Sequence, residues 1–403
     1  MSQNLLTIDM IGRKALVVFE NNLVLTRNVN KEYDSSFAQT GAKIGATLRI
    51  RLPDRALVTD GAALQVQEDN EQYTTLTVSS QKHIGINFTS AEMTMSLDDF
   101  SERVLKPRIS QLASSVDADV ANAYKAVANS VGTPGTAPAT SLVLLQANQK
   151  LNEFAVPLSE RYATVNPAAN AGLVEGLKGL FNPGATISKQ FKSGFMGEGI
   201  LGLDEINMSQ YIVQHTCGSR DATASTTVST TVAAQGATTV VLGQGSVTTT
   251  IKQGDVFTIA SVYAINPQTR QTTGSLQQFV ATADATGVSG TFTVSVSPAM
   301  YTASQALATV DTFPQANAVV TFLGTASTAY AQNLIYNKDA ITFATADLLM
   351  PQGVDMATRQ VHNGISMRIV RAFDINNDRM PTRVDVLYGY STIRPAAAVR
   401  LWG

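Results

Sequence analysis

A threonine-rich, charge-poor stretch is the feature that most limits the fold of this chain. Residues 221–330 hold 24 threonines but only six charged residues, and no helical repeat of apolar positions runs through them. Short alternating runs at 238–242, 255–264, 278–283 and 291–296, separated by Gly, Pro and Asn, are typical of β-strands. We therefore expect an all-β barrel or sandwich, inserted between two segments of different composition.

The strongest helical pattern lies before this stretch, between Leu97 and Val131. Apolar residues recur there every three to four positions, and Gly132 follows the last of them. Pro107 is expected to kink the helix near its first turns. At 1.5 Å per residue, one helix of this length would span roughly 50 Å. The pattern predicts a long helix that crosses a flat or elongated subunit.

Helical and strand patterns occur on both sides of the charge-poor stretch. Their mixture indicates an α+β domain whose two halves are separated by the insertion. The last strand would dock the C-terminal Trp402, either within its own chain or at a subunit contact. Expected helices cover 5–25, 141–154 and 168–181, and expected strands lie within 47–88 and at 162–165, 364–373, 383–390 and 397–402.

Composition excludes several classes of protein. The chain has 29 Lys and Arg against 31 Asp and Glu, so it has no broad basic field to bind nucleic acid or an anionic membrane. Its only cysteine, Cys217, cannot form an intramolecular disulfide, and His83, His215 and His362 are too widely spaced to suggest zinc. There is no signal peptide and no apolar run of membrane-spanning length, which predicts a soluble protein made in a reducing cytoplasm. With only 15% charged residues, its surfaces are expected to meet other protein.

Two short motifs resemble ligand-binding loops, but their surroundings do not fit. Gly197–Gly202 matches G-x-G-x-x-G, yet a loop-like stretch precedes it and no helix pattern follows it, so we interpret it as a loop. Asp374–Asp378 resembles the first half of a calcium loop, but Arg379 stands where glycine is needed. We interpret that segment as a turn between two strands.

No set of residues predicts a catalytic centre. His215 and Cys217 could form a nucleophile pair, but no acid that would orient the histidine is identifiable, so a buried thiol is the preferred interpretation. The adjacent acids Asp98 with Asp99 and Asp204 with Glu205 are better explained by a helix N-terminus and a turn. We predict no catalytic residue, no metal and no cofactor.

Three segments carry a resemblance to a known family. Gly254–Phe279 is similar to the inserted-domain signature of podovirus-type coat proteins, Ala329–Ala340 to the return into the shell domain, and Tyr390–Pro395 to the closing segment. Together with the order of the expected elements, they make the chain resemble the major capsid proteins of tailed bacteriophages.

The resemblance implies an α+β fold of the Hong Kong 97 type with an inserted all-β barrel. It also implies how the chain is divided into parts. These are an N-terminal arm at 1–36, an extended β loop at 37–93, a spine helix and peripheral region at 94–140, an apical domain at 141–217, the inserted barrel at 218–328, and the rest of the apical and peripheral domain at 329–403.

The function implied by the resemblance is that of a major capsid protein. Many copies would self-assemble in the cytoplasm of a host bacterium into the icosahedral head of the virion. The implied partners are a scaffolding protein, a portal and non-specifically packaged double-stranded DNA, with no membrane. The inserted barrel would aid subunit folding and contacts between capsomers.

Identical subunits in such a shell must form heterologous contacts, in which charged side chains would meet opposite charges on neighbouring subunits. The opposing interpretation is that these side chains are merely solvated, because exposed ion pairs are worth only about 0–1 kcal/mol. The candidates are Arg49, Arg51, Asp54 and Arg55 in the β loop, and Arg103, Lys106 and Arg108 on the spine helix.

Two other functions remain open from the sequence. One is a β-rich adhesion or carbohydrate-binding protein, suggested by the threonine-rich module, although it would not explain the long helix. The other is an enzyme that uses the glycine motif, but it lacks a nucleophile or base. Particle size separates these classes, because only a shell protein forms very large assemblies.

Overall fold

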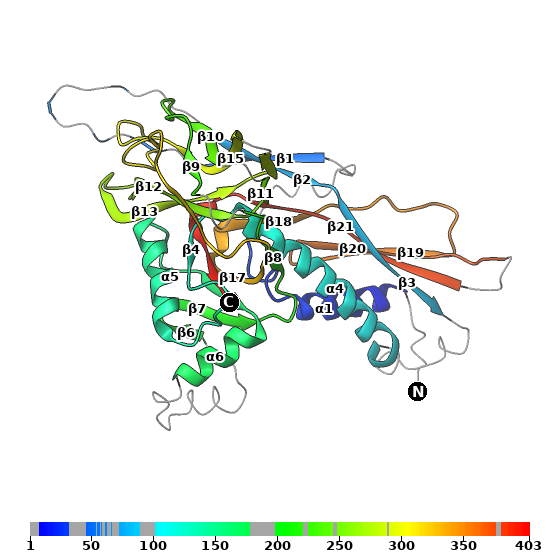
Figure 1. Ribbon diagram of the computed structural model, residues 1–403. Helices are drawn as coiled ribbons and strands as arrows, with labels where there is room; N and C mark the ends of the chain where they lie inside the picture. The colour runs from blue at the N-terminus through cyan, green and yellow to red at the C-terminus, as the bar shows by residue number, and fades with distance from the viewer. Residues whose placement is uncertain are drawn as a thin grey trace. The chain divides into compact units, whose positions relative to one another are not determined.

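The computed structural model describes residues 8–31, 46–88, 101–177, 198–220, 225–244, 248–287, 290–375 and 380–403, apart from short gaps at 54, 57, 59–60, 63–65 and 67–71. The chain divides into two compact units, whose elements are labelled in Figure 1. Unit 1 comprises Met1–Ile50, Tyr73–Ala121 and Ile341–Ser391, and unit 2 comprises Arg51–Gln72, Asn122–Ala340 and Thr392–Gly403.

Unit 1 is built on a five-stranded sheet in which the expected hairpin near the C-terminus is present. Its strand order is β18-β21-β20-β19, and β3 pairs with β21. Strands β20 and β21 are antiparallel neighbours, as the two alternating runs predict. The sheet strands are β3 (Ser80–Phe88), β18 (Ile341–Thr345), β19 (Met356–His362), β20 (Ile365–Arg371) and β21 (Met380–Thr392), and β1 (Ala46–Arg51) pairs separately with β2 (Tyr73–Val78).

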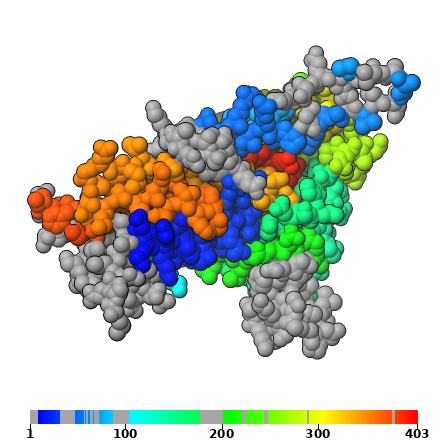
Figure 2. Space-filling view, turned by 180° about the vertical axis from the view of Figure 1, so that it is seen from behind, coloured from blue at the N-terminus to red at the C-terminus, as the bar shows by residue number. Residues whose placement is uncertain are grey.

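Two helices cover part of this sheet. Helix α1 (Ile8–Asn22) buries Ala15, Leu16 and Phe19, and it contacts α4 (Lys106–Ala121) as well as β19 and β20. In Figure 2, α1 in blue lies beside the orange strands. After α1 the chain is held by the buried Asp117, whose carboxylate accepts hydrogen bonds from the backbone N–H (2.8 Å) and hydroxyl (2.7 Å) of Thr26.

The prediction of one continuous helix to Val131 is wrong. The described part of the segment begins as a π-helix, η2 (Ser101–Leu105), continues as α4, and ends in a 3₁₀ turn, η3 (Asn122–Ala126). Ser130 and Val131 form strand β4, because they pair in parallel with the C-terminal strand β22. Pro107 lies in the first turn of α4, directly after the π-helix. Residues 97–100 lie outside the described part.

Unit 2 contains a seven-stranded sheet with helices packed on it. Leu144 and Leu151 of α5 share a core with Val165, Ile335 and Leu401 of the sheet. Trp402 is fully buried in its own chain, so the terminus docks intramolecularly. The sheet order is β4 (Ser130–Val131), β22 (Ala398–Trp402), β17 (Ala329–Asn337), β5 (Arg161–Val165), β7 (Leu203–Met208) and β6 (Glu198–Ile200), with β8 (Gln214–Thr216) beside β17, and the helices are α5 (Ser141–Glu153) and α6 (Pro167–Leu177).

The charge-poor stretch forms only β-strands within the described residues, as its composition predicts. Its six-stranded sheet is nearly closed, because a bridge between Thr227 and Val319 brings the two edge strands together. Phe257 and Phe279 lie in the apolar core that the sheet encloses. The strand order is β16 (Val320–Phe322), β12 (Val256–Ile265), β13 (Thr272–Ala281), β15 (Gly290–Met300), β10 (Ala237–Gln244) and β9 (Thr227–Val228), and β11 (Thr249–Ile251) pairs with β14 (Ala285–Gly287).

The helices in the described ranges are all too short or too polar to cross a membrane.

Candidate functional site

The glycine motif at 197–202 forms a tight hairpin, so its interpretation as a loop is corrected. Glu198–Ile200 and Leu203–Met208 are antiparallel strands, joined by Leu201 and Gly202. Both turn residues have positive φ, 56° and 77°, which is the geometry of a two-residue hairpin turn. Asp204 and Glu205 therefore lie in strand β7 rather than in a turn. Gly197 lies outside the described residues.

The calcium-like segment lies between β20 and β21 in the chain, and the turn expected there stays a prediction. Only its first two residues, Asp374 and Ile375, are described, and Asn376–Arg379 lie outside. Of the other two histidines, His362 Nδ1 is 2.8 Å from a carboxylate oxygen of Glu20, and His83 is exposed on β3. Both agree with the interpretation as surface or packing histidines.

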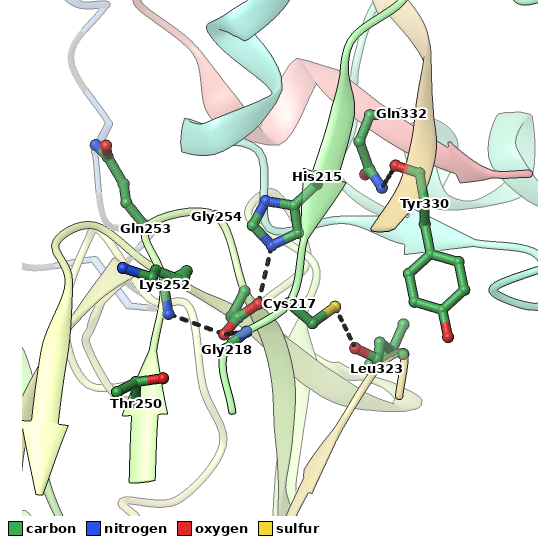
Figure 3. A network of polar contacts seen from close by, with 12 residues as sticks. His215, Cys217, Gly218, Thr250, Lys252, Gln253, Gly254, Leu323, Tyr330 and Gln332 are labelled. Carbon is green, nitrogen blue, oxygen red and sulfur yellow. Dashed lines mark hydrogen bonds and ion pairs between the residues drawn. The ribbon is translucent and has the colours of Figure 1, made fainter. Parts of the chain in front are cut away.

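A buried cluster of charged groups lies around His215, and it contains the acid that sequence reasoning missed. His215 Nε2 is 2.9 Å from Asp255 Oδ1. Figure 3 shows the surroundings of His215, with Cys217, Gly218 and Gly254 nearby. His215 is on β8 and Asp255 directly precedes β12, so the pair is separated by 40 residues. Both side chains are almost fully buried, at 3% and 0% exposure. The statement that no acid orients His215 is therefore wrong.

Asp255 is held as a carboxylate by several donors. The backbone N–H groups of Lys252 (2.9 Å) and Gly218 (3.0 Å) donate to Oδ2, and Arg220 Nη1 lies 3.5 Å from the same oxygen. Burial by itself raises the pKa of Asp255. Hydrogen bonds from His215, Lys252 and Gly218 and the charge of Arg220 lower the pKa, and together they outweigh burial, so the net shift is downward. The cluster therefore carries a buried negative charge.

A buried cation lies on the other side of His215. Tyr124 Oη is 3.1 Å from His215 Nδ1, and the guanidinium of Arg400 is 5.0 Å from the centre of the Tyr124 ring and 4.9 Å from that of Trp402. Arg400 donates to the Gln332 side chain (2.7 Å) and to the Gly254 carbonyl (2.5 Å). Burial lowers its pKa to about 10, so the guanidinium stays charged at neutral pH.

The local sequence allows the close approach that this cluster needs. Gly218 presents its N–H to Asp255 while its α-carbon faces the Thr250 carbonyl, and a Cβ at this position would overlap that carbonyl. Ser219 continues the contact through its N–H to Thr250 Oγ1 (2.9 Å). Glycine at 218 is thus required by packing against a backbone.

His215, Cys217 and Asp255 place possible metal-ligand atoms within 4.8 Å of one another. Their surroundings do not suit a cation, because Arg220 and Arg400 already supply two positive charges. Burial also raises the pKa of Cys217, and its thiol contacts the Leu323 carbonyl at 3.9 Å. Zinc and nucleophilic chemistry both require a thiolate, so the interpretation of Cys217 as a buried thiol agrees with its place in the structure.

The cluster connects the seven-stranded sheet to the six-stranded sheet of the charge-poor stretch, called the inserted module below, and a second group of polar contacts connects the same two parts. The Gln278 side chain accepts from the Ser130 N–H (2.7 Å) and donates to the Ser130 carbonyl (3.0 Å), and Lys150 Nζ donates to the same Gln278 oxygen (2.5 Å). Asn266 donates to the Glu153 carbonyl (2.7 Å). These contacts attach strands β12 and β13 to α5 and β4. Chemically, the site positions the module and offers no exposed reactive group.

The residues predicted to meet neighbouring subunits lie elsewhere. Arg49 is exposed on β1 with its guanidinium 3.4 Å from the centre of the Tyr73 ring. Asp54 lies outside the described residues. Of the other candidates, four are exposed and one is half-buried: Arg51, Arg55, Arg103 and Lys106 are exposed, and Arg108 is half-buried.

Comparison with known proteins gives one match over the whole chain. Residues 1–403 match the family described as P22 coat protein, gene protein 5. No curated protein matches the chain. Among solved structures, one from Mycobacterium phage Che8 is 12% identical, with 94% of this chain and 90% of that chain covered and a TM-score of 0.47.

Two further solved structures are similar to this chain. The capsid structure of the cyanophage P-SCSP1u is 12% identical, with 91% of this chain and 85% of that chain covered and a TM-score of 0.42. The CUS-3 coat protein I-domain is 28% identical and is covered over its entire length by 26% of this chain, with a TM-score of 0.20.

Proposed function

The chain belongs to the P22 coat protein family, and from this premise we propose how its parts serve the assembly of a phage head. It is a bacteriophage major capsid protein with the Hong Kong 97-type fold, and its copies form the icosahedral shell. The match over residues 1–403 is the single observation that carries this conclusion. Its role is structural, and the adhesion and enzyme alternatives are set aside.

The partners of assembly form the first part of the proposal. The shell assembles in the cytoplasm of the host bacterium on a scaffolding protein, incorporates a portal and encloses double-stranded DNA. With a net charge of −2 the chain has no excess of basic residues to bind phosphates, so the shell encloses this DNA without holding it tightly. The protein needs no cofactor and catalyses no reaction in this role.

The division of labour along the chain is the second part. The N-terminal arm (1–36) and the extended β loop (37–93) reach neighbouring subunits, the segment 94–140 forms the spine, and 141–217 with 329–403 form the apical and peripheral regions. The inserted module (218–328) aids folding of the subunit and contacts between capsomers. Its own apolar core around Phe257 and Phe279, and the buried charged cluster at its base, support a rigid attached body.

Charged residues at the subunit contacts are the third part. The exposure of Arg49, Arg51, Arg55, Arg103 and Lys106 leaves these side chains accessible to acidic groups of a neighbour. Many contacts of this kind, each worth about 0–1 kcal/mol, would add up over a closed shell. Asp54 and Arg108 complete the proposed set.

Electron microscopy after size-exclusion chromatography tests the proposal. We expect the recombinant protein, alone or with a candidate scaffolding protein, to form closed shells or long tubes in negative stain. A protein that stays a monomer or dimer under both conditions would contradict the assembly function. Lys106→Glu, compared with the charge-preserving Lys106→Arg, tests whether the spine charges contribute to the assembly rate, and only Lys106→Glu is expected to slow assembly.

A further inference from the structure

The buried cluster around His215 holds more positive than negative charge. Its acid is Asp255, whereas Arg220 and Arg400 each contribute a guanidinium group. Arg220 Nη1 lies 3.5 Å from Asp255 Oδ2, and among the residues that the structure describes no carboxylate forms an ion pair with Arg400. Protonation of His215 would only add to the excess. Unit 2 therefore encloses at least one positive charge that is not paired with a described acid.

The groups that touch Arg400 are neutral. Its Nε donates to Gln332 Oε1 (2.7 Å) and its Nη1 to the Gly254 carbonyl (2.5 Å), and both acceptors are uncharged. Burial raises the pKa of Tyr124 and that of Cys217, so neither side chain supplies a negative charge at neutral pH. Because Arg400 is fully buried, its guanidinium has lost its hydration without gaining a counter-ion.

Two buried N–H groups beside this charge have no acceptor within the described part of the chain. They are Arg400 Nη2 and Trp402 Nε1, and both side chains are fully buried. Arg400 and Trp402 are two residues apart on β22, so their side chains leave the strand on the same face. The guanidinium carbon is 4.9 Å from the centre of the Trp402 ring, which brings the two donors close together. A buried donor without an acceptor is destabilising, so this pair favours an occupant that accepts from both.

The charge and the enclosure of the two donors select the class of occupant. A water molecule accepts from both N–H groups, but it leaves the positive charge unbalanced. A metal cation would add to that charge. Because neither donor atom is reached by solvent, a phosphate or an organic acid is too large. A monatomic anion accepts from both donors and balances the guanidinium charge at the same time.

We propose that unit 2 binds a monatomic monovalent anion, chloride being the physiological one, between Arg400 Nη2 and Trp402 Nε1. The anion accepts a charge-assisted hydrogen bond from Arg400 and a second bond from the indole. Arg400 also donates to the carbonyl of Gly254, the residue before Asp255, so it links the C-terminal strand β22 to the start of β12. The bound anion therefore strengthens the attachment of the inserted module. This inference goes beyond shell assembly and does not rest on it.

Urea unfolding of the full-length subunit at constant ionic strength tests the site. Sodium chloride replaces sodium gluconate stepwise, because gluconate is too large an anion for a site of this kind. Trp402 is the only tryptophan of the chain, so its fluorescence reports both the transition and the site. We expect the unfolding equilibrium constant to fall about tenfold when chloride reaches about ten times its Kd. In the native protein, bromide should quench Trp402 with a saturable dependence, and chloride should reverse the quenching.

Variants separate this site from a general effect of salt. Arg400→Met removes the charge and one donor, and Trp402→Phe removes the other donor but keeps an aromatic ring. With unfolding followed by circular dichroism, we expect chloride to lose its effect in Arg400→Met and to act several-fold more weakly in Trp402→Phe. Arg161→Met is the matched control and should keep the full dependence, because Arg161 is equally buried but all three of its side-chain nitrogens already donate to described acceptors.

Three results would overturn the proposal. The first is a wild type that unfolds at the same urea concentration in chloride and in gluconate, which would mean that the two donors bind water or nothing. The second is a chloride dependence of the same size in the wild type and in Arg400→Met, which would make it a general effect of salt. The third is native protein in which bromide does not quench Trp402 saturably, and this measurement requires no variant to fold. Because all three use the unassembled subunit, a failure to form shells would contradict the proposed function and leave this test intact.

Discussion

Two aspartates with fully buried side chains, Asp255 in unit 2 and Asp385 in unit 1, are neutralised in different ways. Asp255 in unit 2 is surrounded by His215, the Arg220 guanidinium and two backbone N–H groups, with the side chains of His215 and Arg220 only 3% and 8% exposed. Asp385 in unit 1 pairs with Arg368 (2.9 Å) and Arg383 (2.6 Å), whose side chains are 16% and 49% exposed.

The difference determines whether the partners left behind can be hydrated when the carboxylate is removed. Of the partners of Asp385, Arg383 can turn towards water, because its side chain is half exposed. The partners of Asp255 cannot turn towards water, since the side chains of His215 and Arg220 and the two backbone N–H groups that bind it are enclosed. A buried charge that loses its counter-charge is strongly destabilising, whereas an exposed one is rehydrated. The cluster at the base of the inserted module is therefore expected to be the more sensitive of the two.

Asp255→Asn should have the largest effect. Asparagine keeps one acceptor for the N–H groups of Gly218 and Lys252, but it removes the negative charge that balances the buried Arg220 guanidinium, and its NH₂ group would face His215 Nε2. We expect a loss of about 3–5 kcal/mol in the free energy of unfolding, measured by urea denaturation of the subunit with circular dichroism. Asp284→Asn, at an exposed acid paired with Lys252 in the same module, is the control. A loss below 1 kcal/mol for Asp255→Asn would contradict the distinction between the two acids.

Gly218→Ala should have the next largest effect. The new methyl group would overlap the Thr250 carbonyl and push the Gly218 N–H away from Asp255. Overpacking against a backbone is expected to cost about 2–3 kcal/mol. Gly243→Ala in the same module is the control, since neither glycine has a positive φ and the Cβ added at Gly243 would meet only ordinary contacts at 3.6 Å or more. Equal losses in the two variants would show that packing at Gly218 does not support the cluster.

The sequence predicted the strands of the inserted module and the terminal hairpin because alternation is a local signal. It could not predict the end of the long helix, since Val131 fits a helical repeat and a buried strand equally well, and only its pairing with β22 decides. The His215–Asp255 pair was missed for a related reason. The two residues lie 40 positions apart with β11 between them, so no spacing rule connects them. One signal for Asp255 was available in the sequence, because it is one of only six charged residues in the charge-poor stretch.

Asp385→Asn should be milder than either change at the inserted module. Arg383 is half exposed and can be hydrated, while Arg368 keeps its bond to the Leu349 carbonyl (2.6 Å). We expect a loss of about 1–2 kcal/mol by the same urea measurement. Arg383→Gln, which removes only the exposed partner, should cost less still. An equal loss of unfolding free energy for Asp385→Asn and Asp255→Asn would contradict the idea that a half-exposed partner reduces the cost of losing a buried acid.

Lys150→Met should have the smallest effect at neutral pH, and its pH dependence gives the sharper result. Burial lowers the pKa of Lys150 to about 8, below its usual 10.5, so folding penalises the charged form. The unfolded chain then binds more protons between pH 8 and 10.5, and the stability of the wild type rises with pH over that range. Methionine removes the penalty, and Gln278 Oε1 still accepts from the Ser130 N–H.

We therefore expect Lys150→Met to be neutral or stabilising by about 1 kcal/mol at pH 7, and to lose that advantage as the pH is raised towards 10. Urea midpoints measured at pH 7 and at pH 9.5 test the sign. Lys252→Met, at a lysine that is 52% exposed, is the matched control and should show no such convergence with the wild type. A destabilisation by Lys150→Met that is the same at both pH values would mean that its hydrogen bond to Gln278 outweighs the cost of burial. The contact between α5 and the inserted module would then depend on a charge, as the Asp255 cluster does.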